Sequence, residues 1–182
     1  MSNELMSRAR RWEVLDQLAK TIGAKTFVEV GCKEGRTAGF LLHNNPELHV
    51  IAIDPWAPVT NESETYTDWD FKAIEDTFWK NVGDHKGRCT MLRMTSAEAV
   101  QRVEQADLVF IDAGHDYPNA LADIQLWWPK VRVGGFLTGH DYQHKFPGVM
   151  RAVAKSFPLL QVGLFPDSVW AVVNDGQLRI AA

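Results

Sequence analysis

The sequence predicts an α/β fold with a doubly wound, mostly parallel sheet of seven strands, the last of which forms a C-terminal antiparallel hairpin strand. Apolar runs of strand length alternate along the chain with segments in which apolar residues recur at helical spacing. The run 108–111 is apolar without interruption, as is typical of a parallel strand buried on both faces. Near the C-terminus the alternation ends in two strands that flank a short loop, which predicts a hairpin.

The same patterns predict each element in order. The first expected strand contains Phe27, Val28 and Val30, and the others are 49–53, 89–94, 107–112, 136–139, 159–164 and 169–173. The expected helices lie within 2–22, 37–42, 71–82, 96–104, 117–130 and 147–155. We expect Thr67 or Asp68 to cap the helix that begins near residue 71, and Ser96 to cap the next, short helix. Gly134 and Gly135 are expected to form the turn into the fifth strand.

The composition describes one domain. The 182 residues are 46% hydrophobic, which is enough for one full core and leaves little for a second. We therefore expect a single domain over 1–182, with an N-terminal helix in 1–24 and the core in 25–182. The net charge of −4 has its acids and bases scattered, so no basic stripe for nucleic acid is present in the sequence. Charged residues in 2–22 exclude a signal-peptide core, and no apolar run reaches the roughly 20 residues of a membrane helix.

Two further residue types bear on partners and compartment. Cys32 and Cys89 have neither the spacing of a metal site nor that of a disulfide framework, so we expect a reducing, cytoplasmic location. Cys32 is interpreted as a small loop residue without a chemical role. The chain has seven tryptophans, some of which could lie in a homodimer interface, although the sequence leaves the oligomeric state open. We expect a small-molecule partner and no nucleic acid or membrane partner.

Residues 26–37, TFVEVGCKEGRT, form the first candidate binding site. A strand that turns through glycines into a helix presents backbone N–H groups and a helix dipole to a nucleotide-like ligand. Two glycines after a strand also mark an ordinary tight turn, so the loop alone does not decide the matter. Asp54 ends the second strand about 20 residues further on, where a carboxylate can accept hydrogen bonds from ribose hydroxyls. Glu29 precedes Gly31 and no third glycine allows a pyrophosphate to approach, so we expect a nucleoside without a diphosphate.

Polar residues also follow the other expected strands. In a doubly wound sheet, ligands bind outside the carboxyl ends of the strands. The residues at those ends are Glu29 and Gly31, Asp54, Met94 to Ser96, Asp112 to His115, and His140 to Tyr142. Four of the five ends carry a carboxylate or an imidazole, and a charge buried there is costly without a partner. The sequence therefore predicts a functional site at this edge of the sheet.

The segment 107–142, DLVFIDAGHDYPNALADIQLWWPKVRVGGFLTGHDY, resembles the signature of class I S-adenosylmethionine-dependent methyltransferases. It is most similar to the methyltransferase domain 24 group, which is related to the catechol and caffeoyl-CoA O-methyltransferases and to the macrocin-type sugar O-methyltransferases. The hallmarks are the D-x-x-H-x-Y and G-G-x-x-x-x-H-D-Y patterns, and the resemblance covers most of 26–173. It implies a Rossmann-like core and S-adenosylmethionine as cofactor.

The resemblance also implies which residues bind this cofactor. The methionine part would be held by Glu29, Gly31 and Gly35, and the ribose by Asp54. The adenine would lie near Pro55 and Trp56, with its edge against Ser96 and Ala97. The carboxylate of Asp112 would lie beside the cofactor.

Catalytic and metal-binding roles follow from the same resemblance. In metal-dependent relatives the carboxylate matching Asp112 binds a divalent cation, with His140 and Asp141 at the other two ligand positions. His115 falls where those relatives place a basic residue that deprotonates the substrate. Hard cations such as magnesium favour oxygen ligands, so a histidine with two aspartates fits manganese, iron or zinc at least as well. The presence and identity of a metal stay open. Each of these residues could instead have a local role: Asp112 could cap the next helix, His140 and Asp141 could orient their loop, and His115 could contact backbone or substrate.

We therefore expect an S-adenosylmethionine-dependent methyltransferase that methylates a hydroxyl of a small molecule, such as a sugar or a secondary metabolite, with or without a divalent metal. A nicotinamide-dependent oxidoreductase is disfavoured because the first loop lacks G-x-G-x-x-G. A non-catalytic cofactor-binding protein of the same fold is the other alternative. The segment 55–67 is either a surface loop or a lid beside the site.

Overall fold

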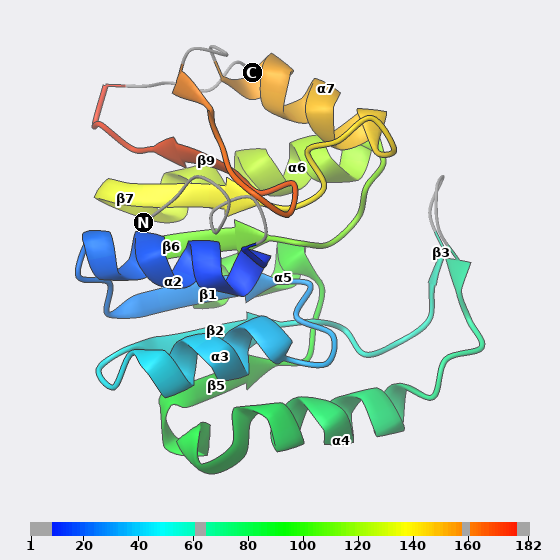
Figure 1. The fold of residues 1–182 in the computed structure, drawn as a ribbon. Helices are drawn as coiled ribbons and strands as arrows, with labels where there is room; N and C mark the ends of the chain where they lie inside the picture. Colours follow the sequence, from blue (N-terminus) through cyan, green and yellow to red (C-terminus); the bar gives the residue numbers. More distant parts are fainter. Residues whose placement is uncertain (1–8, 61–64, 158–160, 178–182) are drawn as a thin grey trace.

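A seven-stranded sheet in the order β5-β2-β1-β6-β7-β9-β8 forms the centre of the computed structural model, which describes residues 9–60, 65–157 and 161–177 (Figure 1). Its strands are β1 (Thr26–Val30), β2 (His49–Ile53), β5 (Cys89–Leu92), β6 (Ala106–Ile111), β7 (Val131–Gly139), β8 (Gly163–Leu164) and β9 (Trp170–Val173). Within this sheet β1, β2, β5, β6 and β7 pair in parallel, whereas β9 is antiparallel to both β7 and β8. The predicted mostly parallel sheet with an antiparallel hairpin strand is confirmed.

Helices cover both faces of this sheet (Figure 1). They are α2 (Arg11–Thr21), α3 (Arg36–Asn44), α4 (Phe71–Val82), α5 (Ser96–Ala99), α6 (Tyr117–Trp127) and α7 (Pro147–Ser156), with 3₁₀ turns η1 (Gly83–Arg88), η2 (Val100–Arg102) and η3 (Trp128–Lys130). One buried apolar cluster joins α2, α3 and α4 to the sheet, and a second joins α5, α6 and α7 to its opposite face. Among the described residues, none of the helices is long and apolar enough to cross a membrane.

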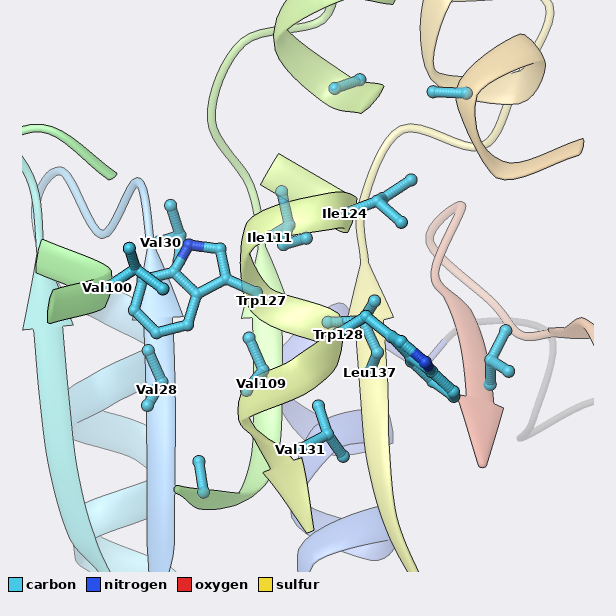
Figure 2. Close-up of a cluster of buried hydrophobic side chains, with 14 of the residues drawn as sticks. Val28, Val30, Val100, Val109, Ile111, Ile124, Trp127, Trp128, Val131 and Leu137 are labelled. Atoms are coloured by element: carbon cyan, nitrogen blue, oxygen red, sulfur yellow. The ribbon is translucent and has the colours of Figure 1, made fainter. Parts of the chain in front are cut away.

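Successive side chains along a strand point to opposite faces of the sheet and so belong to different clusters. In β1, Phe27 belongs to the cluster under α3 and α4, whereas Val28 and Val30 belong to the cluster under α6. Figure 2 shows the second cluster, in which the fully buried indole of Trp127 lies against Val28, Val30 and Val100. Burial on both faces explains why these strands read as nearly continuous apolar runs in the sequence.

The register of the parallel strands sets the position of the site. Val30 pairs with Ile53 of β2 and with Ile111 of β6, and Ile111 pairs in turn with Gly139 of β7. The four strands therefore end level with one another. The residues that follow these four strand ends, Gly31, Asp54, Asp112 and His140, stand at one edge of the sheet.

Three local predictions were wrong. The cap of α4 is Asp70, whose side chain accepts a hydrogen bond from the N–H of Ala73, rather than Thr67 or Asp68. The cap of α5 is Thr95 rather than Ser96. In each case more than one residue near the start of the helix is a suitable cap, and the backbone path selects one of them.

The third concerns Gly134 and Gly135. They lie inside β7, where Gly134 has φ +77° next to a register shift opposite β6, so they form an irregularity within the strand instead of a turn before it.

The segment 55–67 contains a separate two-stranded pair, β3 (Val59–Thr60) and β4 (Thr65–Tyr66). Its first part is anchored rather than exposed, because Trp56 is only 2% exposed and its indole N–H donates to the carbonyl of Lys33. Parts of three predicted elements fall outside the described residues: the start of the N-terminal helix, the tip of the 55–67 segment, and residues 159 and 160 of the sixth strand.

Candidate functional site

A cleft of about 1090 Å³ runs along the carboxyl ends of the parallel strands. Binding pockets for small molecules and cofactors are typically about 300–1,000 Å³, so this cleft is large enough for a nucleoside and a second small molecule. Eleven of the predicted site residues line it: Glu29, Gly31, Asp54, Pro55, Trp56, Ser96, Ala97, Asp112, His115, His140 and Asp141. The structure thus brings together residues that are spread over more than half of the chain.

Gly31 is the tightest point of the glycine loop. Its φ is +86°, and a Cβ added to it would lie 2.2 Å from the carbonyl oxygen of Asp112. Its N–H donates to the carbonyl of Ile53. Gly31 therefore allows the loop after β1 to lie directly against the end of β6.

Gly35 has a different position. It begins α3 with φ +70°, and a Cβ there would lie 2.4 Å from the ring of Phe78 in α4. It is not among the residues that line the cleft. In this structure Gly35 lets two helices pack closely, and the cofactor-binding role that the resemblance implied for it stays a prediction.

Glu29 supplies a buried carboxylate to the floor of the cleft. Its side chain is 2% exposed, and among the described residues its Oε2 atom has no hydrogen-bond partner. Burial, reinforced by the negative charge of Asp112, raises the pKa of Glu29 to about 8, although the Thr37 hydroxyl and the Ala38 N–H oppose this shift. A buried acceptor without a donor is costly, so this position favours a ligand with a hydrogen-bond donor or a positive charge.

Asp54 is held in place by the backbone. One of its oxygens accepts from the N–H of Lys33 and the other from the N–H of Trp56, both at 2.9 Å. Each carboxylate oxygen can accept a second hydrogen bond, so these contacts orient Asp54 and leave it able to bind hydroxyl groups. Burial raises the pKa of Asp54, and the two backbone donors oppose the shift.

Ser96 and Ala97 lie in the segment after β5 and line the cleft. The Ser96 hydroxyl donates to Oδ1 of Asp123 at 2.5 Å and accepts from the indole N–H of Trp127 at 2.8 Å. The hydroxyl has thus used its one hydrogen, so it could contact an adenine edge only as an acceptor, through its second lone pair. Asp123, which sequence reasoning missed, is 7% exposed and also lines the cleft. Its signal in the sequence is a carboxylate in the buried stripe of α6, between Ala120 and Trp127.

Two histidines and two aspartates meet at the ends of β6 and β7. His115 Nε2 lies 2.6 Å from Oδ2 of Asp141, and His140 Nδ1 lies 3.1 Å from the same oxygen. His140 Nδ1 is also 3.5 Å from Oδ1 of Asp112. Asp141 has φ +59°, an unfavourable conformation for a residue with a side chain and one that is often found at functional sites.

This cluster is strongly polarised. Burial alone would lower the pKa of His140, but its contacts with Asp112 and Asp141 raise it to about 9. Burial alone would raise the pKa of Asp141, but the contacts with His115 and His140 hold it well below its usual range. The structure therefore stabilises a charged imidazolium beside a carboxylate.

The first turn of α2 and the C-terminal hairpin also reach this cluster. Arg11 Nε lies 3.5 Å from Oδ2 of Asp112, and the Arg11 N–H donates to Asp167 at 2.9 Å. Asp167 in turn lies 4.0 Å from Nε2 of His140. Neither Arg11 nor Asp167 was predicted as a site residue, because neither follows a parallel strand.

The carboxylates and histidines could also hold a cation. One ligand atom each from Asp112, His115 and Asp141 lies within 4.8 Å of the others among the described residues. The resemblance implied His140 in place of His115. His140 is not part of that group, although its Nδ1 lies 3.1 Å from the same Asp141 oxygen that His115 contacts, so its role as a metal ligand stays a prediction.

Known proteins resemble this chain in sequence and in fold. A family model described as a methyltransferase domain matches residues 28–142. An uncharacterized protein of Acanthamoeba polyphaga mimivirus is 27% identical over 172 residues, which cover 90% of this chain and 74% of that protein. The solved structure of the O-methyltransferase NovP matches with a TM-score of 0.67 at 15% identity, over 90% of this chain and 79% of that one. An O-methyltransferase from Bacillus cereus in complex with SAH matches with a TM-score of 0.59 at 16% identity, over 95% and 82% of the two chains. At these identities the structural matches establish the fold.

Proposed function

The chain belongs to this methyltransferase domain family, and from that membership we propose that it transfers the methyl group of S-adenosylmethionine to a hydroxyl oxygen of a small molecule, such as a sugar or a secondary metabolite. The observation that carries the proposal is the 2.6 Å contact between His115 and Asp141, beside a cleft that is large enough for two ligands. This pair would supply a base where the strands end.

The residues at the first two strand ends suit the cofactor. The unpartnered Oε2 of Glu29 would accept from the ammonium of the methionine part. Asp54, oriented by two backbone N–H groups, would accept from the ribose hydroxyls. Once bound, S-adenosylmethionine supplies a methyl group that its sulfonium already activates. The protein then has to bind, orient and deprotonate the acceptor.

His115 would take the proton of the acceptor hydroxyl. When Nε2 carries the hydrogen shared with Asp141, Nδ1 is the basic nitrogen of the ring. The Asp141 carboxylate then stabilises the imidazolium that forms. The ring of Phe146 stacks on His115, with centroids 4.3 Å apart and an interplanar angle of 23°, and this contact restricts rotation of the imidazole.

A second version of the same mechanism includes a divalent cation. The clustering of Asp112, His115 and Asp141 supports this version. A cation held by both aspartates and one histidine would lower the pKa of a bound hydroxyl. If His115 is that ligand it cannot also be the base, whereas His140 as the ligand leaves His115 available. The two versions therefore make different predictions for the same substitutions.

Titration calorimetry with S-adenosylmethionine and S-adenosylhomocysteine tests the cofactor. Saturable binding of both supports the proposal, and no binding at high protein concentration contradicts it. Saturable NADH fluorescence would instead support the oxidoreductase alternative. Methyl transfer to a panel of sugars and phenols, measured as S-adenosylhomocysteine formed, then separates an enzyme from a non-catalytic binding protein.

A further inference from the structure

We propose that Asp123 is the residue that recognises the base of the bound nucleoside, accepting a hydrogen bond from the exocyclic amino group of adenine. The inference rests on the proposed function, because it takes the ligand to be S-adenosylmethionine or its product. It assigns to α6 a specificity-determining side chain, in addition to the loop residues Ser96 and Ala97.

The first argument is the way the carboxylate is oriented. The indole N–H of Trp127 donates to the Ser96 hydroxyl at 2.8 Å, and that hydroxyl donates to Oδ1 of Asp123 at 2.5 Å. Trp127 is fully buried in the core under α6, where it lies against β1 (Figure 2). A chain of hydrogen bonds from a fixed core residue therefore holds Asp123 in one orientation.

The second argument is the other oxygen of the same carboxylate. Asp123 is 7% exposed and lines the cleft, so more than nine-tenths of it is enclosed by protein. Within 9–60, 65–157 and 161–177, Oδ2 has no hydrogen-bond partner, and it is not one of the unpartnered atoms that are sealed from solvent. Oδ2 therefore keeps some exposure to solvent, on a residue that lines the cleft. An ionised carboxylate only accepts hydrogen bonds, so this oxygen requires a donor.

The charge state agrees with an acceptor. Burial, with the negative charge of Asp116 adding to it, raises the pKa of Asp123 to about 6, while the Ser96 hydroxyl opposes the shift. The group is thus mainly ionised near neutral pH, in a place where a charge is costly without a partner.

The third argument is the position of Asp123 relative to Asp54. Asp54 follows β2, whose neighbour on the outer side is β5, and the segment after β5 carries Ser96. A nucleoside with its ribose at Asp54 can extend its base toward this segment and hence toward Asp123. Small and apolar side chains line the cleft there, as a flat base requires: Ala97, Ala122 and Leu126. Adenine presents an amino group at its edge, whereas hypoxanthine presents a carbonyl oxygen that a carboxylate repels.

The experiment compares two ligands whose bases differ at C6, where an amino group is replaced by a carbonyl oxygen, and at the neighbouring N1, which carries a hydrogen only in hypoxanthine. Titration calorimetry measures the affinity of S-adenosylhomocysteine and of S-inosylhomocysteine for the wild-type protein and for Asp123→Asn. In the wild type we expect S-adenosylhomocysteine to bind at least about tenfold more tightly, since a charge-assisted hydrogen bond is exchanged for a repulsion. In Asp123→Asn the ratio should fall to near one or reverse, because the amide can donate to the carbonyl of hypoxanthine.

Two controls make the outcome decisive. Glu104→Gln removes an exposed carboxylate and should keep the wild-type ratio. If Asp123→Asn does not fold by circular dichroism, Ser96→Ala, which frees the carboxylate from its orienting hydroxyl, should reduce the ratio in its place. Equal wild-type affinity for the two ligands, or a ratio that survives Asp123→Asn, would overturn the assignment of Asp123 alone. Failure of the wild type to bind S-adenosylhomocysteine at all would instead overturn the proposed function.

Discussion

His115 Nε2 lies 2.6 Å from Oδ2 of Asp141, and this contact joins the segment after β6 to the segment after β7. It depends on the parallel register, in which Ile111 and Gly139 end their strands side by side. It also depends on the left-handed backbone of Asp141, which turns the chain sharply at the end of β7. A pair built on two adjacent strands is well suited to hold an imidazole in one position during proton transfer.

The first prediction concerns this pair. His115→Gln should lower kcat about 10²- to 10⁴-fold, because general-base catalysis typically contributes that much. Asp141→Asn should lower kcat less, since the imidazole remains but loses the carboxylate that stabilises its charged form. Affinity for S-adenosylhomocysteine should change little in both variants. His144→Gln, at an exposed histidine in the same segment, is the control and should behave as wild type. Unchanged turnover in His115→Gln would remove the base from the mechanism.

The second prediction concerns the cation. If Asp112 and Asp141 hold a divalent ion, Mn²⁺ added after EDTA dialysis should raise the melting temperature, because a ligand that binds only the native state stabilises it. Asp112→Asn should abolish that rise, whereas Asp84→Asn, at an exposed carboxylate, should keep it. If EDTA does not lower turnover and Mn²⁺ does not change the melting temperature, the metal-free version of the mechanism is the one that remains.

The third prediction follows from Glu29, whose pKa is raised to about 8 by burial and by Asp112. The native state then holds this proton more tightly than the unfolded chain, whose carboxyl has a pKa near 4.5. The free energy of unfolding must therefore fall as pH rises between these two pKa values. The loss is at most about 1.4 kcal/mol for each unit by which the two pKa values differ. Glu29→Gln removes this penalty, so its stability relative to wild type should increase from about pH 5 to about pH 8.

Urea denaturation at several pH values measures this difference. Glu104→Gln removes an exposed carboxylate and should show a constant difference from wild type across the same range. If the difference between Glu29→Gln and wild type is equally constant, Glu29 is ionised in the native protein at all these values.

The fourth prediction links Glu29 to the ligand. If the ammonium of S-adenosylhomocysteine pairs with Glu29, the pKa of Glu29 must fall on binding, and part of a proton is released near neutral pH. Calorimetric titrations in buffers of different ionisation enthalpy measure that release. Glu29→Gln should bind more weakly and release no proton, whereas equal proton release in both proteins would place the ammonium elsewhere.

Much of the fold could be predicted because its signals are local. The bounds of β2 match the predicted strand residue for residue, and β1 contains Phe27, Val28 and Val30 as predicted, because a short apolar run marks each strand. Parallel pairing of these strands is enough to predict that Asp54, Asp112 and His140 share one edge of the sheet. A site assembled from strand ends can be predicted from sequence because each of its residues directly follows an apolar run of strand length.

The rest depends on packing that one segment does not reveal. Thr95 and Ser96 are both suitable caps, and only the path of the chain selects Thr95. The pattern of the glycine loop does not say which glycine faces the cleft, and Gly35 packs against Phe78 instead. Asp123 and Asp167 reach the cleft from a helix face and a hairpin loop, so their roles follow from tertiary contacts alone.

The last prediction separates backbone strain from crowding at Gly31. Both Gly31 and Gly23 have positive φ, at +86° and +58°, so an alanine is strained at either position. A Cβ at Gly23 would have no atom within 4 Å, whereas one at Gly31 would lie 2.2 Å from the carbonyl oxygen of Asp112. Gly23→Ala should therefore cost about 1 kcal/mol of unfolding free energy, and Gly31→Ala several times more. Because relief of the clash must move Asp112, Gly31→Ala should also lose methyl transfer while Gly23→Ala keeps it. Equal destabilisation and full activity in both variants would mean that the loop after β1 can move away from β6 without cost.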